Sequence, residues 1–197
     1  GQVAGSLGPL GFSYQPDKCP VVDIAAPIYE TAVKQQSSFV DFHILETMSS
    51  LEQARGGLMG ATKSTKPVWL SISVDDEDGS KLRSGEHVSE VIPLLKEFGA
   101  QALLVNCSSP EAVTKSIPLL SDCGVPIGAY ANGFINISGG FNKIGSTVDL
   151  LKKREDLTPS VYADFAQKWV AAGASLIGGC CEVGPAHIKE LSVRLRS

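Results

Sequence analysis

The sequence alternates short apolar runs with longer amphipathic stretches, and this alternation constrains the fold more than any other feature. The apolar runs are flanked by turn residues and are too short for buried helices, so we predict that they are strands. The six predicted strands cover residues 3–6, 42–47, 68–74, 102–107, 127–132 and 175–180. The helices are expected near residues 27–36, 50–62, 87–98, 110–122, 159–172 and 184–195. Strands that alternate with helices indicate βαβ units and a parallel sheet.

Several helix boundaries are marked by residues that favour them. Ser109 and Thr158 each precede a proline, which is typical of an N-cap followed by proline at the first helical position. Gly99, Gly124 and Gly173 stand where helices are expected to end, and glycine readily adopts the left-handed conformation of a C-cap. These residues support the predicted order of strands and helices.

A parallel sheet of this kind can close as a doubly wound open sheet or as a (β/α)8 barrel. Polar and reactive residues follow the ends of the predicted strands, at Glu46, Thr47, Asn106, Cys107, Asn132, Cys180 and Cys181. A barrel brings all its strand ends to one rim, whereas an open sheet binds its ligand in one crevice. Because so many strands contribute such residues, we favour an α/β fold of the (β/α)8 TIM-barrel class.

The length of the chain limits how much of a barrel it can form. A complete barrel takes about 250 residues, and the 197 residues here provide six predicted strands rather than eight. The first strand begins almost at residue 1, so we expect residues 1–197 to form a single domain that holds the last six βα units. Such a domain would expose two open sheet edges, which predicts aggregation or association, for example as a homo-oligomer.

Composition and charge argue against two classes of partner. The net charge is −4 and the pI is about 5.4, whereas a nucleic-acid-binding surface normally needs a basic stripe. No apolar run approaches the roughly 20 residues that cross a membrane. Five cysteines are an odd number, and their spacing does not fit a disulfide framework. We therefore expect a cytoplasmic protein with reduced thiols.

Cys107, Cys180 and Cys181 follow the ends of strands that a barrel would bring to the same rim. Adjacent cysteines do not easily form a disulfide with each other, and two neighbouring thiols suit a soft metal. Gly178 and Gly179 would let the backbone approach such a site closely. Three protein ligands and one open position are typical of catalytic zinc, which lowers the pKa of a bound thiol. On spacing alone, a buried structural role for each cysteine is the alternative.

Five segments of the sequence resemble the homocysteine S-methyltransferase family, and they follow one another in the order found in that family. They are Ala4–Pro9, Glu46-Thr47, Asn106-Cys107, Tyr130–Gly133 and Leu176–Cys181, the last of which is followed by Gly184–Ile188. One departure is Ala131, which stands where the family usually has proline. A second is that the family begins with two further βα units, whose first strand ends in an Asp-Gly motif.

The resemblance implies a zinc-dependent methyltransferase with a (β/α)8 fold. Zinc would be held by Cys107, Cys180 and Cys181, and the thiol of homocysteine would receive a methyl group to give methionine. Glu46 and Thr47 would contact the substrate, with the carboxylate of Glu46 pairing with the amino group, and a local salt bridge or cap is the alternative for Glu46. Asn132 would either donate its side-chain amide to the substrate or brace a loop. The donor would be a small molecule, such as a sulfonium, betaine or methyl-tetrahydrofolate. The alternatives are a methyltransferase for another small thiol or selenol, and a zinc-binding remnant without turnover.

The remaining reactive residues are expected to be structural. Cys19 and Cys123 have no partner at ligand spacing, and His43 lies inside a predicted strand. His87 and His187 are expected to be exposed on helices, and Trp69 and Trp169 to pack in the core. The acidic run 75–79 and the segment 82–86 resemble a region of single-domain family members. We expect the acidic run to be a solvated loop, and a site that holds the methyl donor is the alternative. Residues 133–158 form the longest stretch without a clear element, which is typical of a functional or mobile loop.

Overall fold

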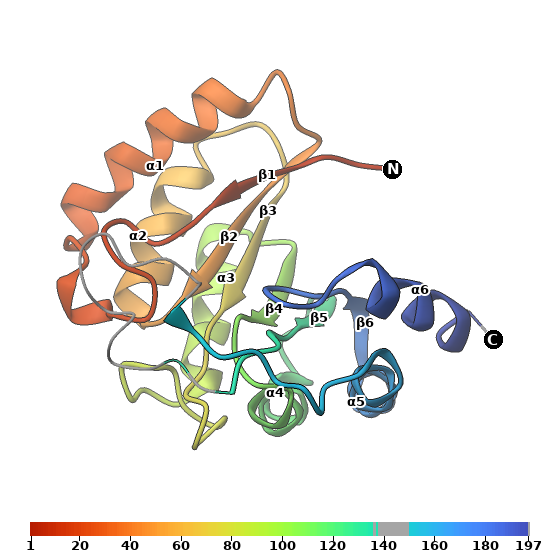
Figure 1. The fold of residues 1–197 in the computed structure, drawn as a ribbon. Helices are drawn as coiled ribbons and strands as arrows, with labels where there is room; N and C mark the ends of the chain where they lie inside the picture. Colours follow the sequence, from red (N-terminus) through yellow and green to blue (C-terminus); the bar gives the residue numbers. More distant parts are fainter. Residues whose placement is uncertain (136, 138–149, 197) are drawn as a thin grey trace.

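The computed structural model describes residues 1–135, 137 and 150–196, which form one parallel sheet with helices packed against it (Figure 1). The strands are β1 (Ala4–Leu7), β2 (Phe42–Met48), β3 (Val68–Ile72), β4 (Ala102–Asn106), β5 (Ile127–Tyr130) and β6 (Ala174–Ile177). The helices are α1 (Val22–Gln36), α2 (Leu51–Ala61), α3 (Ile92–Phe98), α4 (Pro110–Ser116), α5 (Pro159–Ala171) and α6 (Pro185–Arg194). Short 3-10 helices are η1 (Pro16–Lys18), η2 (Val88–Val91) and η3 (Ile117–Leu120).

The order of the strands distinguishes between the two closures of a parallel sheet. The strands lie side by side in the order β1 to β6, and every neighbouring pair is parallel. A doubly wound sheet would reverse its strand order at a switch point, which this sheet does not do. Consecutive helices such as α1 and α2, or α5 and α6, also contact each other, so they cover the same face. The described residues therefore confirm the prediction of six βα units of a barrel.

Several predicted elements end or begin elsewhere than expected. The helix predicted from residue 27 begins at Val22, so Pro27 lies inside it. Close packing of α1 on α2 accounts for this longer helix, because glycines on α2 let the two backbones approach. The fifth and sixth strands end earlier than predicted, at Tyr130 and Ile177. Asn132 and the adjacent cysteines at positions 180 and 181 therefore lie in loops rather than on strand ends.

The predicted helix boundaries around proline and glycine are confirmed. The hydroxyls of Ser109 and Thr158 accept hydrogen bonds from backbone amides three residues later, as N-caps do. Gly99, Gly124 and Gly173 have positive φ angles of 70°, 77° and 105°, which only glycine adopts without strain. Residues 136 and 138–149 of the predicted loop over 133–158 lie outside the described residues. The two segments on either side of these residues pair through an antiparallel bridge between Phe134 and Lys153.

Two apolar layers pack against the two faces of the sheet. The larger lies between the sheet and the helices and contains the fully buried Trp169. The smaller lies on the opposite face, where Ile44, Ala102 and Leu104 pack with Trp69 and neighbouring half-buried residues. Side chains alternate between faces along a strand, so Glu46, Ser71 and Asn106 continue this inner face toward the ends of the strands. The inner face is therefore apolar at one end and polar at the other.

The histidines differ in part from the predictions. His43 is fully buried, as expected of a histidine inside a strand, and His87 is exposed at the start of η2. His187, which we expected to be exposed, is buried. Its Nδ1 atom accepts a hydrogen bond from the amide of Gly184, and its Nε2 atom lies 3.0 Å from the carbonyl oxygen of Leu157. This ring is buried because it caps the first turn of α6 and joins that turn to the segment before α5.

Candidate metal centre

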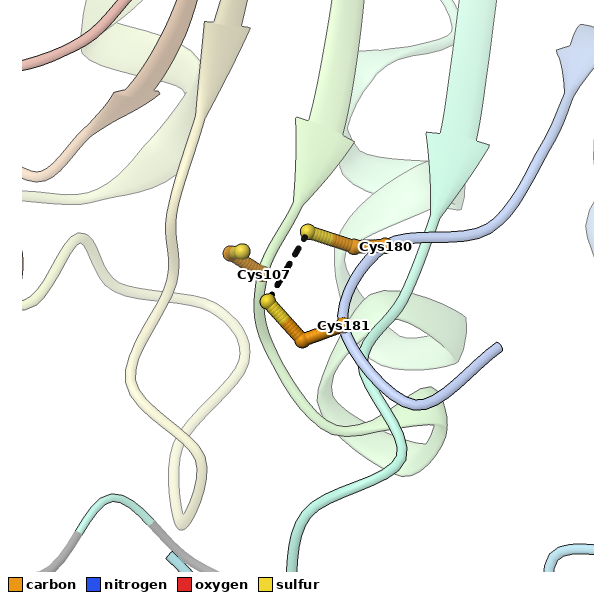
Figure 2. A group of neighbouring side chains, drawn as sticks. All are labelled: Cys107, Cys180 and Cys181. Carbon is orange, nitrogen blue, oxygen red and sulfur yellow. Dashed lines mark hydrogen bonds between the residues drawn. The ribbon is translucent and has the colours of Figure 1, made fainter. Parts of the chain in front are cut away.

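Three cysteine side chains meet beyond the ends of β4 and β6 (Figure 2). The sulfur atoms of Cys107, Cys180 and Cys181 all lie within 4.8 Å of one another. Cys107 is buried, and Cys180 and Cys181 are half-buried. The thiols of the adjacent pair are 3.9 Å apart and hydrogen bonded. The structure thus brings together the three residues that the sequence predicted as metal ligands.

The loop after β6 is held in place by hydrogen bonds to the continuation of β5. The amides of Gly178 and Cys180 donate to the carbonyl oxygens of Ala129 and Ala131, each over 3.0 Å. Cys181 accepts from the amide of Gly133 over 2.8 Å. Residue 179 must be glycine in this arrangement, because a Cβ atom there would lie 2.2 Å from Val183. The predicted close approach of the backbone is therefore present, and it turns both thiols toward Cys107.

The thiols influence one another's protonation. Hydrogen bonds from Cys107 and then Cys180 stabilise the thiolate of Cys181 and lower its pKa. Hydrogen bonds with Cys107 and Cys181, together with burial, raise the pKa of Cys180. The group therefore holds one negative charge more readily than three. A divalent cation would supply the positive charge that allows all three thiols to ionise, and three thiolates with an open fourth position fit zinc.

Beside the cysteines, Asn106 connects three strand ends through its buried amide. Its Oδ1 atom accepts from the backbone amide of Thr47 at 2.9 Å and from the hydroxyl of Ser71 at 2.8 Å. Its Nδ2 atom donates to the hydroxyl of Thr47 at 3.0 Å. Thr47 has a left-handed backbone, with φ of 63°, which is rare for a β-branched residue. Asn106 thus fixes the conformation of Thr47 at the rim.

Glu46 lies on the inner face of β2 with both carboxylate oxygens in contact with hydroxyl donors. The phenol of Tyr130 donates to Oε1 over 2.9 Å, and the hydroxyl of Ser6 donates to Oε2. Burial, followed by the charge of Glu46, raises the pKa of Tyr130, so the phenol keeps its proton and remains a donor. Glu46 is therefore a fixed, half-buried carboxylate at the polar end of the inner face.

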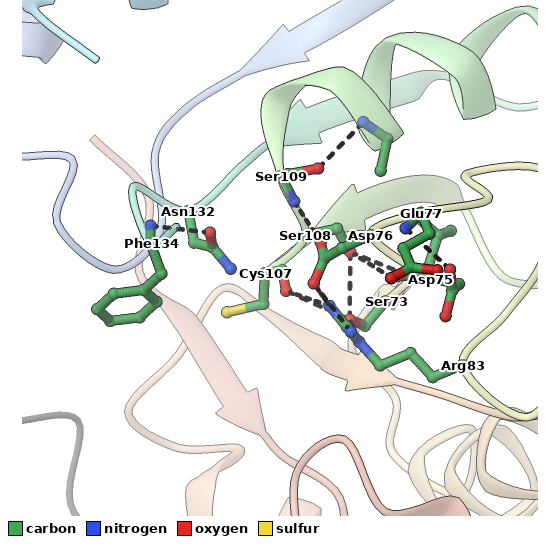
Figure 3. A network of polar contacts seen from close by, with 12 residues as sticks. Ser73, Asp75, Asp76, Glu77, Arg83, Cys107, Ser108, Ser109, Asn132 and Phe134 are labelled. Atoms are coloured by element: carbon green, nitrogen blue, oxygen red, sulfur yellow. Dashed lines mark hydrogen bonds and ion pairs between the residues drawn. The ribbon is translucent and has the colours of Figure 1, made fainter. Parts of the chain in front are cut away.

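Asn132 is 2% exposed, and only one of the two polar atoms of its side-chain amide has a hydrogen-bond partner in the described part of the chain. Its Oδ1 atom accepts from the amide of Phe134 over 3.2 Å, whereas its Nδ2 atom has no hydrogen-bond partner among the described residues. In Figure 3 this nitrogen points toward Cys107. An unpaired buried donor is costly, so such a group beside a site usually has a partner that the protein binds.

Two residues close to the cysteines were not identified from the sequence. Arg83 lies in the segment 82–86, for which the sequence predicted no role, and its side chain is only 10% exposed. Tyr14 lies beside Cys107, and burial and then the charge of Cys107 raise the pKa of its phenol. The one available signal was the resemblance of segment 82–86 to family members, which does not specify a role for either residue.

Comparisons with known proteins agree with this geometry. The family model described as homocysteine S-methyltransferase matches residues 1–195. A homocysteine S-methyltransferase of Escherichia coli (strain K12) is 29% identical over 98% of this chain and 62% of its own length. A selenocysteine methyltransferase of Astragalus bisulcatus is 27% identical over 70% of this chain and 38% of its own length. The chain thus spans less than two thirds of either relative.

A solved structure shows the same similarity in three dimensions. The metallated form of the homocysteine methyltransferase MmuM from Escherichia coli matches with a TM-score of 0.75 at 25% sequence identity. The match covers 98% of this chain and 61% of that protein. Among the residues that our structure describes, no helix combines the length and apolar character needed to cross a membrane.

Proposed function

Because the chain belongs to the homocysteine S-methyltransferase family, we propose that it transfers a methyl group from a small donor to the thiol of homocysteine, giving methionine. The observation that carries this proposal is the convergence of three cysteine sulfur atoms within 4.8 Å. We propose zinc as the metal, held by Cys107, Cys180 and Cys181. Zinc bound there would lower the pKa of a substrate thiol, so that the thiolate is available at neutral pH.

The chain's own residues would bind and orient the amino acid substrate. The carboxylate of Glu46 is positioned by two hydroxyl donors, which suits it to pair with a substrate ammonium group. The unpaired Nδ2 donor of Asn132 would hydrogen bond to the substrate beside Cys107. Thr47, whose hydroxyl is engaged by Asn106, would contribute through its fixed backbone. The methyl group would then pass to the substrate sulfur, and the donor would leave with the electron pair of the broken bond.

Two alternatives follow from particular observations. The similarity to a selenocysteine methyltransferase favours a small selenol as a second acceptor. The other alternative is a domain that binds zinc without turnover, for which the three-cysteine group alone would suffice. We also propose a cytoplasmic location, small-molecule partners and association into homo-oligomers. A reducing compartment suits the five free cysteines.

The test is the zinc content of the purified chain, measured by elemental mass spectrometry. We expect about one zinc per chain, from the single three-cysteine group. Cys107→Ser should lose the zinc. Cys123→Ser should keep it, because Cys123 is not part of the three-cysteine group and its half-buried thiol hydrogen bonds to the carbonyl oxygen of Val125. A folded wild-type chain without zinc would contradict the proposed centre. Zinc binding without methyl transfer to homocysteine or selenohomocysteine would favour the zinc-binding remnant.

A further inference from the structure

Arg83 joins the loop after β3 to Cys107, which follows β4 and is a proposed metal ligand (Figure 3). Its Nε atom donates to the hydroxyl of Ser73 over 2.8 Å, and its Nη2 atom donates to the carbonyl oxygen of Cys107 over 3.1 Å. Both terminal nitrogens also lie 3.1 Å from a carboxylate oxygen of Asp76. A planar guanidinium can make these contacts at once because its donors are fixed in a fork.

Asp76 is itself fixed to the segment that follows Cys107. Its second carboxylate oxygen accepts from the backbone amide of Ser109 over 2.7 Å. Ser109 is the N-cap of α4, so this contact ties the loop to the start of that helix. The Arg83–Asp76 pair thus holds the chain at two points, the carbonyl oxygen of Cys107 and the backbone amide of Ser109.

Cys107 needs such support because its backbone is left-handed, with φ of 50°. This conformation is unfavourable for a residue with a Cβ atom and persists only where the surroundings impose it. The hydrogen bond from Arg83 to the carbonyl oxygen of Cys107 acts directly on this residue. If the carbonyl were released, the backbone could relax toward an extended conformation and turn the sulfur away from Cys180 and Cys181.

Arg83 also positions an aromatic ring next to the sulfur of Cys107. Its guanidinium lies 4.8 Å from the centroid of the Tyr14 ring, within the range of a cation–π contact. The phenol of Tyr14 is hydrogen bonded to the Cys107 side chain. One arginine therefore contacts the backbone of Cys107 directly and its sulfur through Tyr14.

We propose that Arg83 is a positioning residue for the metal centre, fixing the carbonyl of Cys107 and the ring of Tyr14 so that the sulfur of Cys107 faces Cys180 and Cys181. This role rests on the proposed function, because it requires Cys107 to be a metal ligand. It involves no contact between Arg83 and the metal or substrate.

The test is zinc affinity, measured by competition with a chromophoric chelator, with unfolding of the metal-free protein followed in parallel. Arg83→Met should weaken zinc binding roughly 10- to 100-fold, the range seen when a residue that orients a ligand is removed. Arg83→Lys keeps the charge without the fork, so its affinity should lie between those of Arg83→Met and the wild type. Arg55→Met is the matched control, since Arg55 also makes one ion pair, to Glu97, and one cation–π contact, to Phe98.

A second variant covers the case in which Arg83→Met does not fold. Asp76→Asn retains an oxygen for the amide of Ser109 but removes the charge that holds Arg83. It should weaken zinc binding by a smaller factor and lower the melting temperature slightly, since Arg83 loses its ion pair but keeps its hydrogen bonds to Ser73 and Cys107. Wild-type zinc affinity in folded Arg83→Met, or in Asp76→Asn where the first does not fold, would overturn this inference alone. A folded wild-type chain that binds no zinc would instead overturn the proposed function, and this inference with it.

Discussion

Replacing Asn106 with leucine, a side chain of similar size, should show how strongly one buried amide supports the rim. The amide is 1% exposed and joins Thr47 on β2 to Ser71 on β3. Leucine would leave two buried donors without acceptors, the backbone amide of Thr47 and the hydroxyl of Ser71. Each such group costs about 1–3 kcal/mol, so the free energy of unfolding should fall by about 2–6 kcal/mol. That is a large fraction of the roughly 5–15 kcal/mol typical of a domain.

The assay is urea unfolding of the metal-free protein in a double-mutant cycle with Ser71→Ala. Ser71→Ala alone removes one hydrogen bond and should cost about 0.5–1.5 kcal/mol, because Asn106 still accepts from Thr47. In the Ser71→Ala background, Asn106→Leu leaves one donor fewer unpaired and should cost about 1–3 kcal/mol less than it does alone. Additive effects, or a cost of Asn106→Leu below about 1 kcal/mol, would refute the reasoning.

Three further substitutions test the packing and charge of the site. Gly179→Ala places a Cβ atom 2.2 Å from Val183, so the loop must shift. The zinc content measured by mass spectrometry should fall to about half or less. Gly60→Ala places a Cβ atom 2.3 Å from the carbonyl oxygen of Ala26. It should separate α1 from α2 and lower the free energy of unfolding in urea by about 1–3 kcal/mol. Glu46→Gln keeps an acceptor but loses the charge, so KM for homocysteine should rise roughly five- to tenfold.

Each substitution has a control in the same chain. Adding Val183→Gly to Gly179→Ala removes both the Cβ and Cγ atoms that clash and should restore zinc, whereas no recovery would show that the glycine matters for another reason. Gly8→Ala adds a Cβ atom with no neighbour within 4 Å, so a stability loss equal to that of Gly60→Ala would contradict the packing argument. Zinc content should not change in Glu46→Gln, and an unchanged KM would remove Glu46 from the proposed substrate site.

The strand–helix alternation and the three cysteines could be predicted because their signals are local in the sequence. Turn residues and apolar runs mark each strand, and side-chain placement follows from parallel strands that end at one rim. Two adjacent cysteines, Cys180 and Cys181, do not easily form a disulfide with each other, and this indicated a metal site. Strand ends were less accurate. The amides of Gly178 and Cys180 still donate to the continuation of β5 although β6 itself ends at Ile177, so the sequence pattern runs on past the strand.

The contributions of Arg83 and Tyr14 could not be predicted for a different physical reason. Both residues lie in polar segments, and an arginine in such a segment is usually solvated. Arg83 is buried only because acceptors from three separate places, on Ser73, Asp76 and Cys107, surround it in the folded chain. The burial of His187 has the same origin, since it depends on a carbonyl 30 residues earlier. Contacts of this kind appear only once the fold is known.

The two strands that the cysteines follow are not neighbours, since β5 lies between β4 and β6. A metal held by Cys107 and Cys180 would therefore act as a cross-link that closes a loop of 73 positions in the chain. A covalent cross-link over such a loop lowers the entropy of the unfolded chain by an amount worth roughly 4 kcal/mol. Chelation of the metal should thus release mainly the segment from β4 to β6, with faster amide hydrogen exchange there than in α1 and α2. The same ion that prepares a substrate would then also govern how often the C-terminal half of the molecule opens.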